Sequence, residues 1–318
     1  MTRPSALPTE IIKVNATGVH PADDMLAAEE PLEIRIVFGD KDQRIQKSIS
    51  VTMRTPGNDF ELATGFLFTE GIIKDAEDIT AIKHCNGLNE NVVRVELKED
   101  VAVEMNKLER NFYTTSSCGV CGKSSIEAVK TVCRLPEINN DTLTFSSEII
   151  YLLPDILRSR QDVFDFTGGL HGCGLFDIEG NLLLTREDVG RHNALDKLIG
   201  ASLNTSLFPL NKYLLLLSGR ASFELIQKAW MAGIKIIAAV GAPSSLAVQM
   251  AEESGITLVG FLRNKTYNIY SGSHRIEINQ NHSKGHTDNA SKVSSLSTRG
   301  EELSEWSQRT PVETPSEG

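Results

Sequence analysis

Cys118 and Cys121 are the residues whose type and spacing most directly suggest chemistry. Two residues separate them in the polar stretch TTSSCGVCGKSSIE, and a glycine follows each one, so little side-chain bulk covers the thiols. A helix is expected to begin near Ser124, and its positive end, together with Lys123, would lower the pKa of a thiol just ahead of it. Such a nucleophilic pair could bind a metal, form a disulfide or carry sulfur to another molecule.

A structural zinc site is the first alternative for this pair. Tetrahedral zinc takes four protein ligands, commonly two CxxC pairs or one pair with histidines. The remaining cysteines, Cys85, Cys133 and Cys173, stand singly, and the sequence has no second CxxC pair. The sequence also disfavours a thioredoxin-like role, because in thioredoxin-like proteins the CxxC follows the first strand of a βαβ unit. Here more than 100 residues precede it.

Two glycine- and serine-rich turns are candidates for anion binding. SGRAS (218–222) and VGAPSS (240–245) each lie between an apolar strand-like run and a helical pattern, and Arg220 stands inside the first. Free backbone N–H groups and the positive end of a helix favour phosphate at such turns. The alternative is two ordinary strand-to-helix connections. Neither turn matches GxGxxG or GxxxxGK[ST], so NAD and ATP are not indicated.

A third polar segment, TREDVGRHNALDK (185–197), spans a strand end and a helix start. Charges on a surface helix would explain Lys197 well, but they explain GRHN at the turn poorly. Arg263 and Lys265 follow the last strand and would add positive charge if the carboxyl ends of the strands meet there. The sequence therefore predicts a local basic site at this edge.

The segment TGGLHGCG contains His171 and Cys173, which could form a nucleophile or ligand pair. The same glycines are also typical of a turn that leads into a strand, so both interpretations stay open. Cys85, in HCNG, and Cys133, in TVCRL, are expected to be turn or packing residues.

Composition limits the classes of function. The chain has 318 residues, 40% of them apolar, and a net charge of −10, so it can bury a core and is not a general binder of nucleic acid or anionic membranes. Its apolar runs are too short to cross a membrane. No apolar leader is visible at the N-terminus, which predicts a cytoplasmic, reducing location with cysteines as thiols.

The elements that must position these residues fall into two groups. Residues 31–40 and 44–53 alternate apolar and polar around a GDKD turn, which predicts a hairpin, and NDFELATGFLFTEGII has helical spacing. With further strand-like segments they form a small α+β domain, 29–142, that ends in the CxxC loop and its helix. We expect residues 1–28 to be an irregular, flexible arm.

From residue 143 onward, strands and helices alternate. A helical pattern containing Pro154, which could kink or split it, is followed by a hairpin turned near Gly180, a helix and two strand–turn–helix units. This order predicts an α/β domain with a mostly parallel sheet over 143–279. Residues 280–318 are rich in Ser, Thr, Glu and Gly, which predicts a disordered tail.

Five separated motifs make a family resemblance specific. TTSSCGVCGKSSIE, FDFTGGLHGCGLFD, LTREDVGRHNALDKLIG, SGRASFELIQKA and VGFLRNKTYNIYSG, in this order, resemble the FdhD-type formate dehydrogenase accessory proteins, the FdhD/NarQ family. RTPGNDFELATGFLFTEGII in the first domain adds a sixth. The resemblance covers residues 29–279.

The resemblance implies a sulfurtransferase that acts as a sulfur carrier. Family members take sulfur as a persulfide from a cysteine desulfurase and pass it to the molybdenum cofactor, in its bis-molybdopterin guanine dinucleotide form, before formate dehydrogenase receives it. It implies Cys118 as the persulfide carrier, Cys121 as the supporting thiol and a homodimer. The implied cofactor-binding segment is Phe261, Leu262, Arg263, Asn264, Lys265 and Thr266, and Arg220 of the SGRAS turn is a further candidate.

The resemblance also implies a cytidine-deaminase-like fold for the second domain. A zinc deaminase needs an HxE signature and a later PCxxC. The chain has neither signature, and GRHN and SGRAS occupy the helix starts where the zinc ligands of a deaminase would lie. We therefore expect the second domain to have the deaminase-like fold without a zinc site. The alternative function is a non-catalytic molybdenum-cofactor chaperone whose CxxC is structural.

Overall fold

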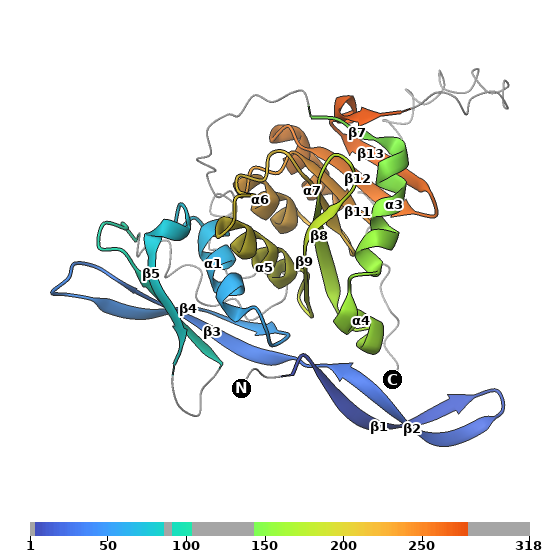
Figure 1. Ribbon diagram of the computed structural model, residues 1–318, viewed down its shortest axis with the longest axis horizontal. Helices are drawn as coiled ribbons and strands as arrows, with labels where there is room; N and C mark the ends of the chain where they lie inside the picture. The colour runs from blue at the N-terminus through green and yellow to red at the C-terminus, as the bar shows by residue number, and fades with distance from the viewer. Residues whose placement is uncertain (1–3, 86–90, 104–142, 279–318) are drawn as a thin grey trace, which may run out of the picture. The chain divides into compact units, whose positions relative to one another are not determined.

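The structure, a computed structural model, describes residues 4–85, 91–103 and 143–278 (Figure 1). Its contacts divide the chain into two units, Met1–Glu277 and Ile278–Gly318. Every element named below belongs to the first unit, and Ile278 is the one residue of the second unit within the described ranges.

The strands are β1 (Ala6–Asn15), β2 (Gly18–Ala27), β3 (Glu30–Phe38), β4 (Ile45–Arg54), β5 (Ile79–His84), β6 (Val92–Leu97), β7 (Phe145–Ser146), β8 (His171–Phe176), β9 (Leu182–Asp188), β10 (Leu214–Leu217), β11 (Ile236–Ala239), β12 (Thr257–Arg263), β13 (Thr266–Ser271) and β14 (Ile276–Glu277). The α-helices are α1 (Asp59–Thr69), α3 (Ser147–Arg158), α4 (Asp162–Thr167), α5 (Arg191–Leu203), α6 (Phe223–Met231) and α7 (Ser245–Glu253). Short 3-10 helices span Ala76–Asp78 and Ser273–Arg275.

A six-stranded sheet, in the order β13-β12-β11-β10-β8-β9, forms the centre of the second half of the chain. β10, β11 and β12 are parallel, while β8, β9 and β13 run antiparallel to their neighbours. The mostly parallel sheet that the strand–turn–helix units predict is therefore present at its centre. The carboxyl ends of β10, β11 and β12 meet at one edge, where α/β proteins usually place their ligands.

Alternation along the central strands builds two apolar layers. Leu214 and Leu216 of β10 face a cluster that includes α3, whereas Leu215 and Leu217 face the cluster that includes α5, α6 and α7. Side chains of a strand point to opposite faces in turn, so a continuous run of leucines suits a sheet covered on both sides. Figure 1 shows α3 on one face of the sheet and α5 to α7 on the other.

The first half of the chain forms a four-stranded sheet, β4-β3-β6-β5, and its helix α1 packs against α5. The predicted hairpin, β3 with β4, and the predicted helix are confirmed. Gly65 of α1 and Gly200 of α5 meet where the two helices cross. A Cβ on Gly65 would collide with the carbonyl oxygen of Asp196, and one on Gly200 with that of Glu61, so the backbones touch directly.

The N-terminal arm differs from the expectation of an irregular segment. β1 and β2 pair over their full length as an antiparallel hairpin, from Ala6 opposite Ala27 to Asn15 opposite Gly18. The side-chain oxygen of Asn15 accepts the backbone N–H of Thr17 at 2.9 Å and closes the turn. Short polar and proline residues within these strands concealed the alternation that normally signals a hairpin.

The helix that contains Pro154 also differs in detail. α3 continues through Pro154, and the chain leaves the helix only after Arg158. Proline removes one hydrogen bond to the residue four positions earlier. Ile150, Leu153 and Leu157 of α3 are completely or almost completely buried, and this packing holds the helix together.

Two sequence predictions about organisation lie at or beyond the described ranges. The proposed domain boundary at residue 143 adjoins residues 104–142, which the structure does not describe, and it stays a prediction. The predicted tail 280–318 lies outside the described residues. Among the described helices, none has both the length and the apolar character needed to cross a membrane.

Candidate functional site

The two glycine- and serine-rich turns lie side by side at the carboxyl ends of the parallel strands, as the sequence predicts. Residues 218–222 follow β10, and residues 240–245 follow β11. The backbone N–H of Gly241 donates to the carbonyl of Gly219 over 3.0 Å. A Cβ on Gly241 would lie 3.0 Å from the backbone nitrogen of Arg220, so glycine permits this close approach.

Three helices begin at the same edge: α5 after Gly190, α6 after Ser222 and α7 after Ser244. The hydroxyl of Ser244 accepts the N–H of Ala247 at 3.2 Å and caps α7. No side-chain hydrogen bond caps α5 or α6 through Gly190 or Ser222. The first N–H groups of α5, with the positive end of its dipole, therefore suit an anionic ligand, whereas the first turn of α6 already carries the Glu224 carboxylate.

Side chains from the starts of α5 and α6 contact one another. His192 Nε2 lies 3.3 Å from the hydroxyl of Ser222 and 3.8 Å from a carboxylate oxygen of Glu224. Burial alone would raise the pKa of Glu224, but hydrogen bonds from His192, the Glu224 backbone and Ser222 outweigh it and lower the pKa to about 2. Glu224 is therefore ionised at neutral pH and fixes the His192 ring.

His171, at the start of β8, lies at the same edge because β8 runs antiparallel to β10. Its ring packs on Gly219, where a Cβ would be 3.2 Å from Nδ1. Burial lowers the pKa of His171, and the neighbouring Arg191 lowers it further. The imidazole is thus neutral at pH 7. Arg191 Nε is buried and has no hydrogen-bond partner among the described residues.

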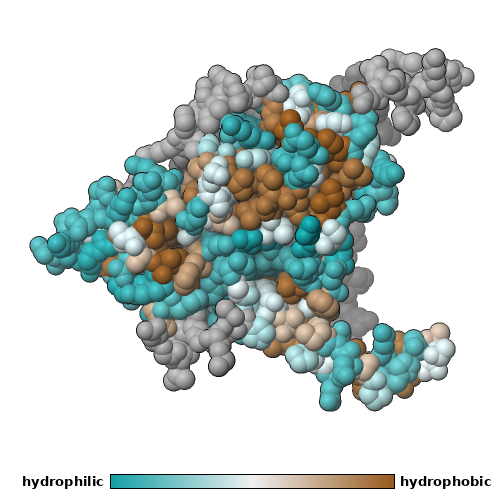
Figure 2. All heavy atoms as spheres, viewed as in Figure 1, coloured by the Kyte–Doolittle hydropathy of each residue, from teal (hydrophilic) through white to brown (hydrophobic). Residues whose placement is uncertain are grey.

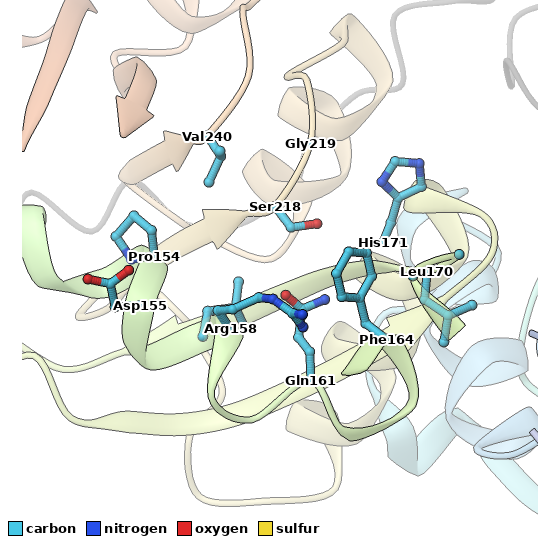
Figure 3. Close-up of a pocket in the computed structure, with 13 residues that line it drawn as sticks. Pro154, Asp155, Arg158, Gln161, Phe164, Leu170, His171, Ser218, Gly219 and Val240 are labelled. Atoms are coloured by element: carbon cyan, nitrogen blue, oxygen red, sulfur yellow. The ribbon is translucent and has the colours of Figure 1, made fainter. Parts of the chain in front are cut away.

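A cavity of about 590 Å³ opens beside these residues, between α3, α4 and the turns after β10 and β11 (Figure 3). Arg158 of α3 stacks its guanidinium 4.2 Å from the ring centre of Phe164 and pairs with Asp165 at 2.6 Å. His171 and Ser218 line the opposite side in Figure 3. A flat aromatic or guanidinium surface with several polar groups is typical of sites for small ring-containing ligands.

The segment 261–266 forms the end of β12 and the turn into β13. The backbone N–H of Phe261 donates to the carbonyl of Gly241 at 3.1 Å, which attaches this segment to the turn after β11. Asn264 and Lys265 have φ values of 52° and 53°, the left-handed pair that a tight two-residue hairpin turn requires. The candidate segment therefore adjoins the strand-end turns.

The side chains of this segment do not all face outward. Arg263, Asn264, Lys265 and Thr266 are exposed, as is Arg220 in the first turn. The side chain of Leu262 is completely buried in the core cluster with α3, so only its backbone is available to a ligand. The exposed cations of the predicted basic site lie on the loops after β10 and β12, at the same end of the sheet, with the turn after β11 between them.

Of the five cysteines, the structure describes Cys85 and Cys173. Cys118, Cys121 and Cys133 lie outside the described residues. Cys173 is 1% exposed, and its thiol lies 3.1 Å from the carbonyl of Ala194. Burial raises the pKa of this thiol well above its usual range, so the alternative of a His171–Cys173 nucleophile pair is wrong.

The segment 185–197 divides between two roles. Lys197 is buried, not part of a surface face, and its amine lies 2.7 Å from the carboxylate of Asp188, itself completely buried. The same amine donates to the carbonyl of Thr55 at 2.9 Å, and the Asn193 amide donates to the carbonyl of Met53 at 2.7 Å. These residues join β4 to α5, while His192 and Arg191 face the strand-end edge.

Sequence reasoning missed the cavity residues Arg158, Gln161 and Phe164. Their helical pattern gave no sign of an opening, because the cavity forms only where α3 and α4 meet the turns of the sheet. An aromatic residue and an arginine close together in RSRQDVF were the one available signal. In the described ranges, no three His, Cys, Asp or Glu side chains are grouped so that they could hold a metal ion.

Fold and site define an α/β protein whose strand ends bring together uncapped helix starts, exposed basic side chains and a polar cavity. The FdhD/NarQ family matches residues 27–277, which is most of the chain. The chain belongs to this family, and the resemblance seen in its motifs is confirmed.

Several proteins are similar over most of their length. The chain is 50% identical over 275 residues to the sulfur carrier protein FdhD of Streptomyces avermitilis, which covers 85% of this chain and 95% of that protein. It is 47% identical to the protein of the same name from Mycobacterium tuberculosis, covering 83% and 95%. A crystal structure from Desulfotalea psychrophila, described as a formate dehydrogenase accessory protein, matches with a TM-score of 0.67 and 26% identity, covering 86% of this chain and 100% of that one.

Proposed function

We propose that this chain is a sulfur carrier required for formate dehydrogenase activity. It accepts persulfide sulfur from a cysteine desulfurase and transfers it to the bis-molybdopterin guanine dinucleotide form of the molybdenum cofactor, before formate dehydrogenase receives the cofactor. One observation carries the proposal. A relative named sulfur carrier protein FdhD is 50% identical to this chain over 95% of its own length, and the chain has a CxxC pair in its sequence.

The first step of the proposed chemistry needs a single thiolate. Cys118 attacks the terminal sulfur of the desulfurase persulfide, the sulfur–sulfur bond on the desulfurase breaks, and the desulfurase cysteine leaves as a thiolate. Cys118 then carries the extra sulfur, and no net oxidation has occurred. A glycine-flanked, polar sequence around Cys118 favours the required access and ionisation.

The second step uses the second thiol. Cys121 attacks the Sγ of Cys118, a Cys118–Cys121 disulfide forms, and the terminal sulfur leaves as hydrosulfide and binds the metal of the cofactor. The two cysteines lose the two electrons that reduce the transferred sulfur to sulfide. A cellular dithiol reductant then returns the disulfide to thiols, as the expected cytoplasmic location allows.

The cofactor itself is the cargo of this reaction. Its phosphates suit the uncapped start of α5, with Arg220, Arg263 and Lys265 as exposed cations on the loops after β10 and β12. The buried Arg191 Nε, which has no partner among the described residues, is a further donor for an anion at this edge. An acidic protein with one local basic edge would bind such a ligand selectively.

Restoration of formate dehydrogenase activity in cells that lack their own carrier tests the proposal. Wild type should restore activity and Cys118→Ala should not, because no other residue replaces the attacking thiolate. Cys85→Ala, a half-buried cysteine outside the CxxC pair, is the matched control and should behave like wild type. If Cys118→Ala restored full activity, the chain would instead be a cofactor chaperone whose CxxC is structural.

A further inference from the structure

The cavity between α3, α4 and the strand-end turns has a lining that can distinguish one ring-containing ligand from another. Apolar side chains also lie on open surface, for example Val14 and Val19 of the β1–β2 hairpin, at the lower right of Figure 2. Such side chains contribute no directional hydrogen bond. In the cavity, by contrast, apolar walls that include Pro154, Leu157 and Val240 stand beside polar groups that can orient a ligand.

Gln161 places a hydrogen-bond acceptor in the cavity lining. Its side chain is 4% exposed and lies across Gly172, where a Cβ would collide with Nε2. Nε2 donates to Oε1 of Glu187 at 3.5 Å, and this contact fixes which way the amide points. The amide oxygen has no hydrogen-bond partner among the described residues. An acceptor that is so largely buried and has no partner favours a ligand with an N–H group.

Asp155 is a second acceptor of the same lining. It lies one turn before Arg158 on α3, its side chain is exposed, and it forms no ion pair within the described ranges. Figure 3 shows Asp155 and His171 at opposite ends of the cavity, with Arg158, Gln161 and Phe164 between them. A carboxylate accepts two hydrogen bonds side by side, so it suits a ring edge with two adjacent N–H donors.

The cavity also offers a flat surface and a neighbouring positive charge. Arg158 and Phe164 form a stacked pair, and a planar ring can stack on either member. Ser218 and Gly219 line the wall formed by the turn after β10, and the exposed Arg220 follows them in the chain. A phosphate attached to a ring in the cavity would therefore be close to Arg220, at the edge where α5 begins.

The acceptors of the lining select one kind of ring edge. Guanine and pterin share a 2-amino-4-oxopyrimidine ring, in which the ring N–H and the exocyclic amino group are adjacent donors. Adenine and cytosine place an acceptor nitrogen beside the amino group, and a carboxylate repels it. Uracil flanks its N–H with two carbonyl oxygens. Only the edge that guanine and pterin share gives a carboxylate two donors among these rings.

We propose that Asp155 is the specificity-determining residue of the cavity and binds the 2-amino-4-oxopyrimidine edge of the cargo. Its carboxylate accepts the ring N–H and the amino group, Gln161 Oε1 accepts a further N–H, and the ring stacks on the pair of Arg158 and Phe164. This inference rests on the proposed function, in which the cargo contains both a guanine and a pterin.

A change of nucleobase, combined with one substitution, tests the proposal. Xanthosine diphosphate carries an oxygen where guanosine diphosphate carries the amino group. Asp155→Asn supplies one N–H and one oxygen, which match that oxygen and the ring N–H of xanthine. By calorimetry, wild type should bind guanosine diphosphate about tenfold or more tightly than xanthosine diphosphate, and Asp155→Asn should reverse this order.

A matched control separates the ring edge from general effects of charge. Asp162→Asn removes the same charge from an exposed position of α4 that does not line the cavity, so it should keep the wild-type preference. A purely structural role of Asp155 would weaken both nucleotides alike and would not reverse their order. Reversal by Asp155→Asn and not by Asp162→Asn would therefore support the proposal.

A second arm of the experiment distinguishes the two rings of the cargo. Neopterin, a free pterin, is titrated against wild type and Asp155→Asn. A reversed nucleotide preference assigns guanine to the cavity, whereas about tenfold weaker neopterin binding with an unchanged nucleotide preference assigns the pterin.

The remaining outcomes contradict the inference and distinguish it from the proposed function. An unchanged nucleotide preference together with unchanged neopterin binding in Asp155→Asn would overturn the role of Asp155, while the proposed function would stand. If wild type bound neither guanosine diphosphate nor neopterin, the proposed cargo would be wrong, and the proposed function would fail together with this inference.

Discussion

The charged segment 185–197 contributes residues to two different regions of the molecule. At the joint between β4 and α5, Asp188 and Lys197 are buried 2.7 Å apart, and both form further hydrogen bonds, with backbone groups and with the Asn193 amide. At the strand-end edge, His192 and Arg191 are only partly buried, and a nitrogen of Arg191 has no partner in the described ranges. Complete pairing is typical of a structural joint. The incompletely paired region is the edge at which we propose that the cargo binds.

The largest expected effect is at the joint. Lys197→Met keeps the bulk of the side chain but leaves the completely buried Asp188 without its cation. Breaking a buried pair in this way costs about 3–5 kcal/mol of unfolding free energy, measured by chemical denaturation. Lys265→Met, at an exposed position of the strand-end edge, should change stability by less than about 0.5 kcal/mol. A loss below about 1 kcal/mol for Lys197→Met would contradict a structural joint.

A second change sharpens the same contrast through packing. Gly200→Ala places a Cβ against the backbone of α1 and should cost about 1–3 kcal/mol, because the helices must move apart. Gly255→Ala is the control, since a Cβ there meets no atom within 4 Å and only its φ of 64° is unfavourable, at about 1 kcal/mol. Equal thermal midpoints for the two variants would show that the crossing tolerates a side chain.

The strand-end edge should respond in binding and not in stability. Arg220→Ala removes an exposed cation beside the uncapped helix starts, and binding of guanosine diphosphate, the nucleotide part of the proposed cargo, should weaken about tenfold by calorimetry. Its thermal midpoint should stay that of wild type. Lys212→Ala removes an exposed cation that precedes β10, at the other end of the strand, and should leave binding unchanged. Equal weakening by both would indicate only a general effect of charge.

The smallest effect concerns the pH dependence of Glu224. Its pKa falls from 4.5 to about 2 on folding, so its carboxylate contributes stability in full above about pH 5, and this contribution is lost as the pH falls from 4.5 towards 2. After solvent screening the contribution is about 1 kcal/mol or less. The difference in thermal midpoint between wild type and Glu224→Gln should therefore be constant above pH 5 and shrink below 4.5. A difference in thermal midpoint that grew towards low pH would show that folding raises the pKa of Glu224 and does not lower it.

Much of the second half of the chain could be predicted from sequence, because its signals are local. Leucine runs followed by SGRAS and VGAPSS specify buried strands, turns and helix starts, and the turns meet as expected. The β1–β2 hairpin was missed because its strands contain prolines and lack regular alternation.

The candidate site was predictable only in part. The exposed side chains of Arg220 and Arg263 lie at the same edge of the sheet because parallel strands end there, a rule that needs no coordinates. The burial of Lys197 and Leu262 could not be foreseen, since it depends on contacts with β4 and α3 that are distant in sequence. The same is true of the cavity beside Phe164.

Intact mass after incubation with a cysteine desulfurase and cysteine tests the central claim most directly. Wild type should gain one sulfur atom that a thiol reductant removes, fragmentation should place it on Cys118, and Cys118→Ala should gain none. The same reducible gain in Cys118→Ala, or no gain in wild type beside a desulfurase shown to be active, would contradict the account.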